Sequence, residues 1–313
     1  MTSSATQWPA HGCAIRSVDP ACAEEMPQIL YIMGTGRSGT TILEVLLANE
    51  KDIVGSGELK HIFRDAFLRN LPCACGKRSH ACEWWSAVRK ETGWSDADCR
   101  RYRDAIEAIE RHRNFLRILS GCVLRHEWDV YEQGTTTLFR ALGRLSRARV
   151  VVDSSKYPGR ALMLARLFPR HVRVLCITRS AYGLIAAFQK QNDEEQRPKH
   201  PIAAAAYYVY VLLCMRLART RLGDRCLSIR FEDLTRDPVG VLSRIERWSG
   251  VSLARVRQML AAGEMFRVGH VVTGNRLRKQ GVVKFDPSVA RTDGSPPRLL
   301  AWILERYRAL LGF

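Results

Sequence analysis

The chain has 313 residues, 46% of them apolar, which is enough to bury a large core in one or two domains. Its formal net charge is +18, and 40 of its 49 basic residues are arginine. This excess indicates an anionic partner. However, no basic run is long enough for a nucleic-acid-binding tail and no DNA- or RNA-binding motif is present, so nucleic acid is not expected.

The first segment, residues 1–27, mixes Ser, Pro, His and acidic residues. It lacks a basic region followed by an apolar one, so we expect a flexible tail and no secretory signal. Without a signal, the ten cysteines are expected to be thiols and the protein cytoplasmic. The longest apolar run, residues 202–215, is shorter than the ~20 residues that span a bilayer and predicts a buried helix. No transmembrane segment is therefore expected. A peripheral membrane contact stays open, and nothing indicates the oligomeric state.

Strand and helix patterns alternate along the remaining residues, 28–313, which we expect to form one domain. Short apolar runs predict strands at 28–33, 149–152, 172–178 and 225–230. Helical patterns lie near 40–49, 96–120, 129–147, 158–168, 180–190, 202–222, 238–248 and 298–311. This alternation predicts an α/β fold of three layers, with helices on both faces of a central parallel sheet. Residues 50–148 are predicted to be a mostly helical insertion that covers the site. The polar stretches 191–201 and 284–297 predict linkers or mobile loops.

The most informative motif follows the first predicted strand. It reads Gly34-Thr35-Gly36-Arg37-Ser38-Gly39-Thr40-Thr41 and leads into a helical pattern. A strand, a glycine turn and a helix start form a phosphate cradle, because backbone N–H groups and the positive end of the helix dipole face the anion. The frame is that of a Walker A loop, but Thr40 stands where the lysine belongs and Arg37 lies within the loop. The missing lysine suggests a nucleotide without a γ-phosphate.

This loop resembles the 5′-phosphosulfate loop of PAPS-dependent sulfotransferases, commonly P-R-S-G-T-T, with Gly36 in place of the proline. The Gly-Glu motif at Gly57-Glu58 is similar to that of tyrosylprotein and bacterial carbohydrate-type members. Further segments follow in the family's order, namely 151–156, 174–179, 230–234 and 274–281. The resemblance implies a P-loop-like fold, PAPS (3′-phosphoadenosine 5′-phosphosulfate) as co-substrate and no required metal. It also implies transfer of a sulfuryl group to a hydroxyl of a carbohydrate, lipid-linked or small-molecule acceptor. The acceptor itself is not indicated.

The resemblance also assigns roles to single residues. Residues Gly36 to Thr41 would hold the 5′-phosphosulfate, with Arg37 and Lys156 stabilising the charge that develops on the leaving nucleotide. A base must remove the acceptor's proton. Glu58 is the expected base, and His61 is the rival because cytosolic members use a histidine.

The 3′-phosphate distinguishes PAPS from ATP-like ligands. Arg179, after the strand at 172–178, matches the family's 3′-phosphate arginine, but the serine expected eight positions later is Ala187. Arg278, Lys279 and Gly281 resemble the Arg-Lys-x-Gly loop that closes over the same phosphate. The residues that contact the adenine are not indicated.

Two other functional classes remain open at this stage. Residues 150–153 also match a Walker B strand, with Asp153 ordering Mg²⁺ in a P-loop kinase or NTPase that acts on a small molecule. The missing Walker lysine weighs against this reading. A non-enzymatic polyanion-binding protein would also explain the basic charge.

Three cysteines form a separate motif at residues 73, 75 and 82. Cys73, Cys75 and Cys82, with His80 nearby, could hold zinc, although the usual C-x2-C spacing is absent and the fourth ligand is uncertain. A local disulfide and free thiols are the alternatives.

Overall fold

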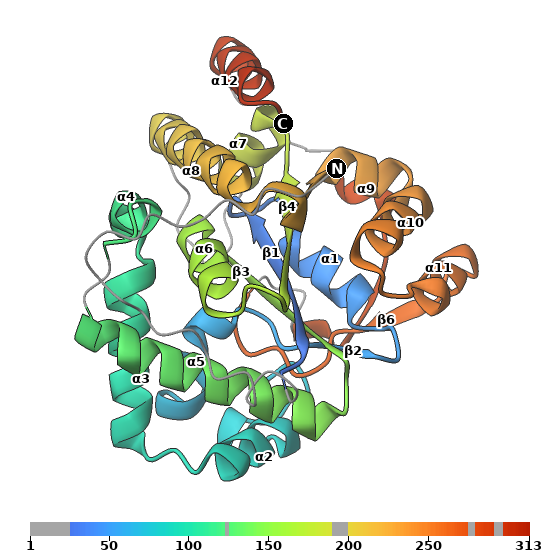
Figure 1. Ribbon diagram of the computed structural model, residues 1–313. Helices are drawn as coiled ribbons and strands as arrows, with labels where there is room; N and C mark the ends of the chain where they lie inside the picture. The colour runs from blue at the N-terminus through green and yellow to red at the C-terminus, as the bar shows by residue number, and fades with distance from the viewer. Residues whose placement is uncertain (1–25, 123–124, 190–199, 275–278, 291–296) are drawn as a thin grey trace, which may run out of the picture.

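The computed structural model describes residues 26–122, 125–189, 200–274, 279–290 and 297–313. Five parallel strands form the central sheet in the order β2-β3-β1-β4-β5 (Figure 1). The strands are β1 Gln28–Gly34, β2 Ile53–Gly55, β3 Val150–Lys156, β4 Val172–Thr178 and β5 Cys226–Arg230. The predicted α/β fold with a parallel sheet is thus confirmed. Strand β2 was not predicted because its three residues are too few to give an apolar run.

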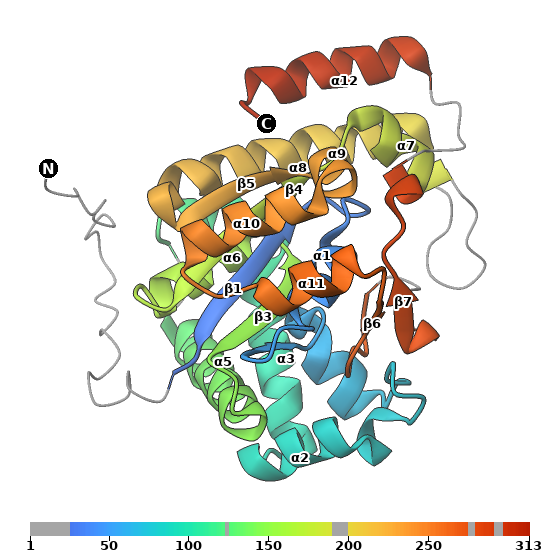
Figure 2. The same cartoon turned by 90° about the vertical axis from the view of Figure 1, so that its right-hand side faces the viewer.

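Helices cover both faces of this sheet, as Figures 1 and 2 show. The side chains of β1 alternate: Leu30 and Ile32 belong to one core, while Ile29, Tyr31 and Met33 belong to the other. The first core is shared with α1 Thr40–Leu47, α10 Pro238–Ser249 and α11 Ala254–Ala261. The second is shared with α5 Arg125–Ser146, α6 Pro158–Leu167, α7 Ala181–Gln189 and α8 Pro201–Leu222. Burial of both faces explains the apolar runs at residues 29–33, 150–152 and 174–177.

Between β2 and β3 the chain is mainly helical. Its helices are α2 Glu83–Thr92, α3 Asp96–Glu110, α4 Phe115–Leu119 and α5. The shorter turns are Leu59–His61, the π-helical Phe63–Leu68, Ser79–Ala81 and His112–Asn114. Figure 2 shows α2 and α3 at the opposite end of the molecule from α12 Arg298–Leu310.

The single helix predicted at 96–120 is wrong, because the structure breaks it into α3 and α4. Backbone angles at Arg111 are extended (φ −59°, ψ 141°), and the side-chain amide of Asn114 donates to the carbonyl of Ala108. That bond satisfies a carbonyl that the helix end leaves open. The sequence around Asn114 keeps the helical spacing of apolar residues, so a single asparagine there does not reveal that the helix ends.

The C-terminal part adds an antiparallel strand pair and two short helices, α9 Phe231–Arg236 and α11, that lie outside the predicted ranges. Strands β6 Met265–Arg267 and β7 Val282–Lys284 form the antiparallel pair, and α9 follows β5 directly. Turns lie at Gly223–Arg225 and Pro287–Ala290. Most of the predicted loop 191–201, and residues 291–296 of the predicted loop 284–297, lie outside the described residues.

Helix α8 is long and apolar. Over the described chain, Pro201–Arg225 is the one helix whose length and mean hydropathy of 1.5 would suit a membrane span. In the structure it packs against α6 and α7, and Tyr208, Val211 and Met215 are fully buried. One side of α8 therefore belongs to the core, while Ile202, Tyr210 and Leu213 on it are exposed.

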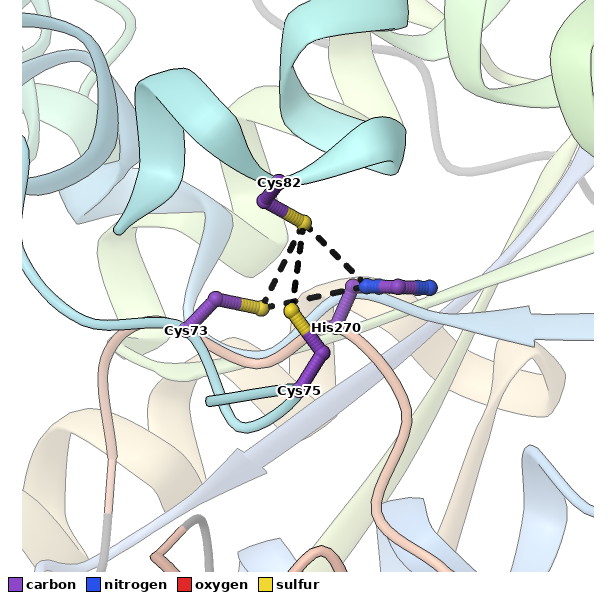
Figure 3. A group of neighbouring side chains, drawn as sticks. All are labelled: Cys73, Cys75, Cys82 and His270. Carbon is purple, nitrogen blue, oxygen red and sulfur yellow. Dashed lines mark hydrogen bonds between the residues drawn. The ribbon is translucent and has the colours of Figure 1, made fainter. Parts of the chain in front are cut away.

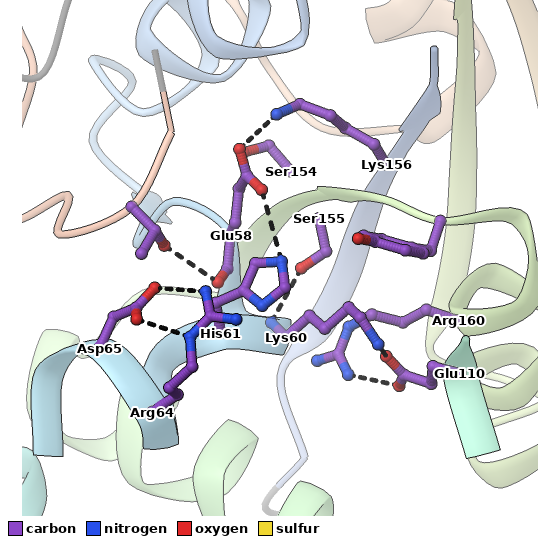
Figure 4. Close-up of polar contacts among 12 residues, drawn as sticks. Glu58, Lys60, His61, Arg64, Asp65, Glu110, Ser154, Ser155, Lys156 and Arg160 are labelled. Carbon is purple, nitrogen blue, oxygen red and sulfur yellow. Dashed lines mark hydrogen bonds and ion pairs between the residues drawn. The ribbon is translucent and has the colours of Figure 1, made fainter. Parts of the chain in front are cut away.

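A buried ionic network joins the insertion to the sheet (Figure 4). The guanidinium of Arg160, on α6, donates from Nε to Asp153 Oδ2 at 2.7 Å and from Nη1 to Glu110 Oε1 at 2.6 Å. Glu110, at the end of α3, also pairs with Lys60 Nζ at 3.3 Å and accepts from the Tyr131 hydroxyl at 2.8 Å. Each buried charge therefore faces an opposite charge, as burial demands.

Candidate active site

The loop at residues 34–41 connects the carboxyl end of β1 to α1, as predicted. Gly39 is the N-cap of α1 and has a φ of 89°, a conformation that L side chains rarely adopt. A Cβ there would also lie 2.2 Å from Cδ2 of Phe231, so only glycine fits. Ser38 Oγ donates to the carbonyl of Thr35 at 2.8 Å, and Thr40 and Thr41 are buried. The backbone N–H groups at the start of α1 thus form the kind of cradle that binds a phosphate.

Gly36 and Arg37 form the middle of this loop. The N–H of Gly36 donates to the hydroxyl of Tyr207 at 3.0 Å. A proline at this position, as in the family motif, would have no N–H to donate. Arg37 has a φ of 65°, an uncommon left-handed conformation for a side chain of its size. Its carbonyl accepts a hydrogen bond from Nη1 of Arg179 at 3.2 Å.

Arg179 lies at the carboxyl end of β4, beside the loop. Its guanidinium lies 4.7 Å from the ring centroid of Phe231, and its carbonyl accepts from the Tyr208 hydroxyl at 2.9 Å. Only 7% of the residue is exposed, and burial lowers the pKa of Arg179. A desolvated cation gains from an arriving anion. Ala187, on α7, is half-buried and its methyl group offers no donor.

Glu58 and Lys156 meet next to the loop, although 98 positions separate them (Figure 4). Lys156 is the last residue of β3 and donates from Nζ to Oε1 of Glu58. Their side chains are 22% and 12% exposed, so both groups are open to a small molecule. His61, the rival base, has Nε2 4.0 Å from Oε2 of Glu58. Burial lowers the pKa of His61 to about 4, so its imidazole is neutral at pH 7.

The turn that carries Glu58 is bonded to both β3 and α1. The carbonyl of Gly57 accepts from the N–H of Ser154 at 3.1 Å, and the N–H of Lys60 donates to Ser155 Oγ at 2.9 Å. Glu44, on α1, accepts from the N–H of Gly57 at 2.6 Å and from the Ser154 hydroxyl at 2.5 Å. Burial raises the pKa of Glu44 to about 7. These bonds fix Glu58 relative to Lys156.

Asp153, the Walker B candidate, is fully buried. Its Oδ2 accepts from Arg160 Nε at 2.7 Å, and its Oδ1 accepts from the N–H of Ser155 at 3.0 Å and from the Ser155 hydroxyl. Both carboxylate oxygens are thus engaged in structural bonds, which disfavours the metal-ordering role of a kinase or NTPase.

The C-terminal segment closes against the same site. Thr273 Oγ1 donates to the carbonyl of Glu58 at 3.3 Å. A Cβ on Gly274 would lie 3.6 Å from Oε1 of Glu58 and 3.8 Å from Oγ1 of Thr41, so this glycine adjoins both the candidate base and the loop. The carbonyl of Gly281 accepts from the N–H of Val268 at 2.9 Å, and Lys279 is exposed. Contact of these two residues with a nucleotide stays a prediction, and Arg278 lies outside the described residues.

The three predicted metal-ligating cysteines also come together, but with a different histidine. Cys73, Cys75 and Cys82 group with His270 (Figure 3). His80 is instead bonded through Nε2 to the carbonyl of Phe67 at 2.8 Å.

Sequence reasoning missed Glu44 and Tyr207 at this site and His270 in the cysteine group. Glu44 is a charged residue within the apolar run of α1, and that contrast was a usable signal of a buried role. Tyr207 lies within the apolar α8 and His270 in a segment without pattern, so only the fold reveals them.

Comparisons with known proteins give one result for the sequence and one for the fold. A family model described as "Sulfotransferase family" matches residues 27–255. No curated protein matches the chain. A solved sulfotransferase domain from the curacin biosynthetic pathway has a TM-score of 0.51 and 18% identity, covering 92% of this chain and 98% of that one. A sulfotransferase domain from the Synechococcus PCC 7002 olefin synthase has a TM-score of 0.42 and 19% identity, covering 97% and 98%.

The burial of Glu44 predicts a pH dependence of stability. Because its pKa rises from the usual 4.5 to about 7 on folding, the folded state holds an extra proton between these values. The contribution of this group to stability is therefore greatest below pH 4.5 and is lost as the pH rises through about 7. Relative to Glu44→Gln, which stays neutral, the wild type should lose on the order of 3 kcal/mol between pH 4.5 and pH 8. Urea unfolding across this range measures the difference. Parallel curves for the two proteins would contradict the assignment, and Glu264→Gln, at an exposed position, is the matched control.

Proposed function

Since this chain belongs to the sulfotransferase family, as the match over residues 27–255 shows, we propose that PAPS is its sulfuryl donor. We propose as acceptor a hydroxyl of a carbohydrate, lipid-linked or small molecule. The observation that carries the proposal is the pairing of Glu58 with Lys156 at the mouth of a phosphate loop that has no Walker lysine. This contact supports a base and a cation side by side where a bound phosphosulfate would end.

The residues around the loop fit such a nucleotide. Gly39 admits no side chain, which leaves the backbone N–H groups at the helix start open to the 5′-phosphosulfate. The desolvated guanidinium of Arg179, bonded to the loop at Arg37, supports a second anionic group on the ligand, the 3′-phosphate. Two anionic subsites at one loop suit a doubly phosphorylated adenosine better than a nucleoside triphosphate.

The proposed chemistry is a single in-line displacement. PAPS supplies the sulfuryl group and departs as 3′,5′-ADP. The acceptor oxygen bonds to sulfur as the bond from sulfur to the phosphate oxygen breaks, and the acceptor's proton passes to Glu58. Lys156 and Arg37 stabilise the negative charge that gathers on the departing oxygen. No metal ion takes part in this step.

Aromatic side chains adjoin the Glu58–Lys156 pair and suit the acceptor. His112 stacks on Tyr157 with 4.5 Å between ring centroids and lies edge-on to Tyr207 at 6.3 Å. Tyr157 directly follows Lys156, and the hydroxyl of Tyr207 is bonded to the loop at Gly36. The three rings therefore extend from Lys156 to the phosphate loop. The three side chains are only half-buried, which supports an acceptor with a sugar or aromatic ring.

The first prediction from the proposed function concerns Arg179. If Arg179 binds the 3′-phosphate, Arg179→Ala should strongly weaken the binding of 3′,5′-ADP, because a charge-assisted hydrogen bond is worth about 1.5–3 kcal/mol. Affinity for 5′-AMP, which lacks that phosphate, should hardly change. Calorimetry with both ligands makes the comparison. Arg173→Ala, at the other end of β4, is the control and should affect neither. Equal losses for the two ligands in Arg179→Ala would mean that Arg179 only supports the loop.

A second prediction concerns the base. Glu58→Gln keeps size and polarity but cannot accept the acceptor's proton, so kcat should fall by about 10²–10⁴. Affinity for 3′,5′-ADP, measured by calorimetry, should stay nearly unchanged.

His61→Asn is the matched control and should cost much less activity than Glu58→Gln. An inactive His61→Asn beside an active Glu58→Gln would transfer the role to the histidine. If both variants stay active, the acceptor is acidic enough to react without a base, and the assignment of Glu58 is wrong while the donor remains PAPS.

A further inference from the structure

A compact group of soft ligands lies away from the proposed reaction. The sulfurs of Cys73, Cys75 and Cys82 and the imidazole of His270 lie within 4.8 Å of one another (Figure 3). The three cysteines lie before α2, whereas His270 is 188 positions beyond Cys82. The fold therefore assembles the group from two distant segments.

Four of the six distances between these ligand atoms are close to the edges of a tetrahedral site, and the other two are within 4.8 Å. Sγ of Cys82 lies 3.6 Å from Sγ of Cys75 and 3.7 Å from Sγ of Cys73. Nδ1 of His270 lies 3.3 Å from Sγ of Cys82 and 3.8 Å from Sγ of Cys73. Zinc bonds of about 2.3 Å to sulfur and about 2.0 Å to nitrogen imply edges of about 3.8 Å and about 3.5 Å in a tetrahedral site. The four ligand atoms thus already surround a point that suits a zinc ion.

The local backbone holds the cysteines in a tight turn. The N–H of Gly76 donates to the carbonyl of Cys73 at 2.9 Å, and Gly76 has a φ of 87° that favours glycine. The N–H of Cys73 donates to the carbonyl of Lys77 at 2.9 Å, which closes the turn around Cys75.

Two tryptophans orient the histidine. Trp85 Nε1 donates to the carbonyl of His270 at 2.8 Å. Trp84 stacks on the imidazole, with ring planes 18° apart and centroids 6.1 Å apart. These contacts keep Nδ1 of His270 directed at the three sulfurs.

We propose that Cys73, Cys75, Cys82 and His270 bind a structural zinc ion. Thiolate and imidazole are the ligands that zinc prefers, and four protein ligands leave no open position for a substrate or water. A disulfide fits less well, because its sulfurs would be about 2.0 Å apart and it would leave one thiol and the imidazole without a function.

The zinc would tie the insertion to the segment that closes over the active site. His270 directly precedes residues 271–274, where Thr273 and Gly274 adjoin Glu58. A Cβ on Gly57 would lie 2.9 Å from Cγ1 of Val271, so this segment packs tightly on the turn of the candidate base. On the other side, the N–H of Ala74 donates to the carbonyl of Val271 at 2.8 Å. The ion would thus anchor one end of the closing segment.

The test begins with metal content. The full chain, purified under reducing conditions from zinc-supplemented medium, should contain close to one zinc ion per chain by mass spectrometry of the metal. The zinc content of Cys82→Ser and of His270→Ala should be lower than that of the wild type by about tenfold or more. Cys99→Ser, a buried thiol outside the group, and His80→Gln should retain it. Retention in Cys82→Ser together with loss in His80→Gln would overturn the ligand assignment.

Two further measurements do not depend on whether a variant folds. Co²⁺ titrated into metal-depleted wild-type protein should give the visible absorption bands of tetrahedral thiolate coordination. Hydrogen exchange should then speed up on zinc removal at residues 71–85 and 265–274, with the central sheet little changed. Absence of both zinc and the Co²⁺ bands, or a disulfide between two of the three cysteines in the purified protein, would refute the proposal. None of these outcomes depends on sulfuryl transfer.

Discussion

A single buried guanidinium holds the insertion and the sheet in one arrangement. Arg160, only 1% exposed, bridges Asp153 of β3 and Glu110 of α3, and Glu110 in turn holds Lys60. Removing one member of a buried ionic group leaves an uncompensated charge and costs about 3–5 kcal/mol. Because Lys60 lies two residues after Glu58, this network fixes the turn of the candidate base against the end of β3, where Lys156 lies. The geometry of the proposed active site therefore depends on this buried network.

The carboxyl ends of the strands deliver the other parts of the site. Strand β1 leads into the phosphate loop, β3 ends in Lys156, β4 leads to Arg179, and β5 leads to Phe231, which packs on both Gly39 and Arg179. These positions were predictable, because each follows an apolar run long enough to indicate a buried parallel strand. Parallel strands bring their carboxyl ends to one edge, so the convergence followed from the strands alone. The three-residue β2, the break at Arg111 and the pairing of β6 with β7 left no such pattern in the sequence.

Two departures from the family motif differ in how the fold responds to them. Gly36 replaces a proline, and its additional N–H is bonded to Tyr207, so the loop gains a contact with α8. Ala187 replaces a serine and provides no equivalent donor. Side-chain contacts between distant segments, such as Gly36 with Tyr207 or Cys82 with His270, could not be predicted because they depend on how helices pack. The order of motifs along the chain carries no information about such packing.

We propose that the loop at residues 34–41 binds a 3′-phosphorylated nucleotide rather than a nucleoside triphosphate. Calorimetric titration of the wild-type protein with 3′,5′-ADP, with no Mg²⁺ added, and with ATP plus Mg²⁺ tests it most directly. We expect the protein to bind 3′,5′-ADP without Mg²⁺ and far more tightly than ATP. Mg²⁺-dependent binding of ATP with no binding of 3′,5′-ADP would contradict it.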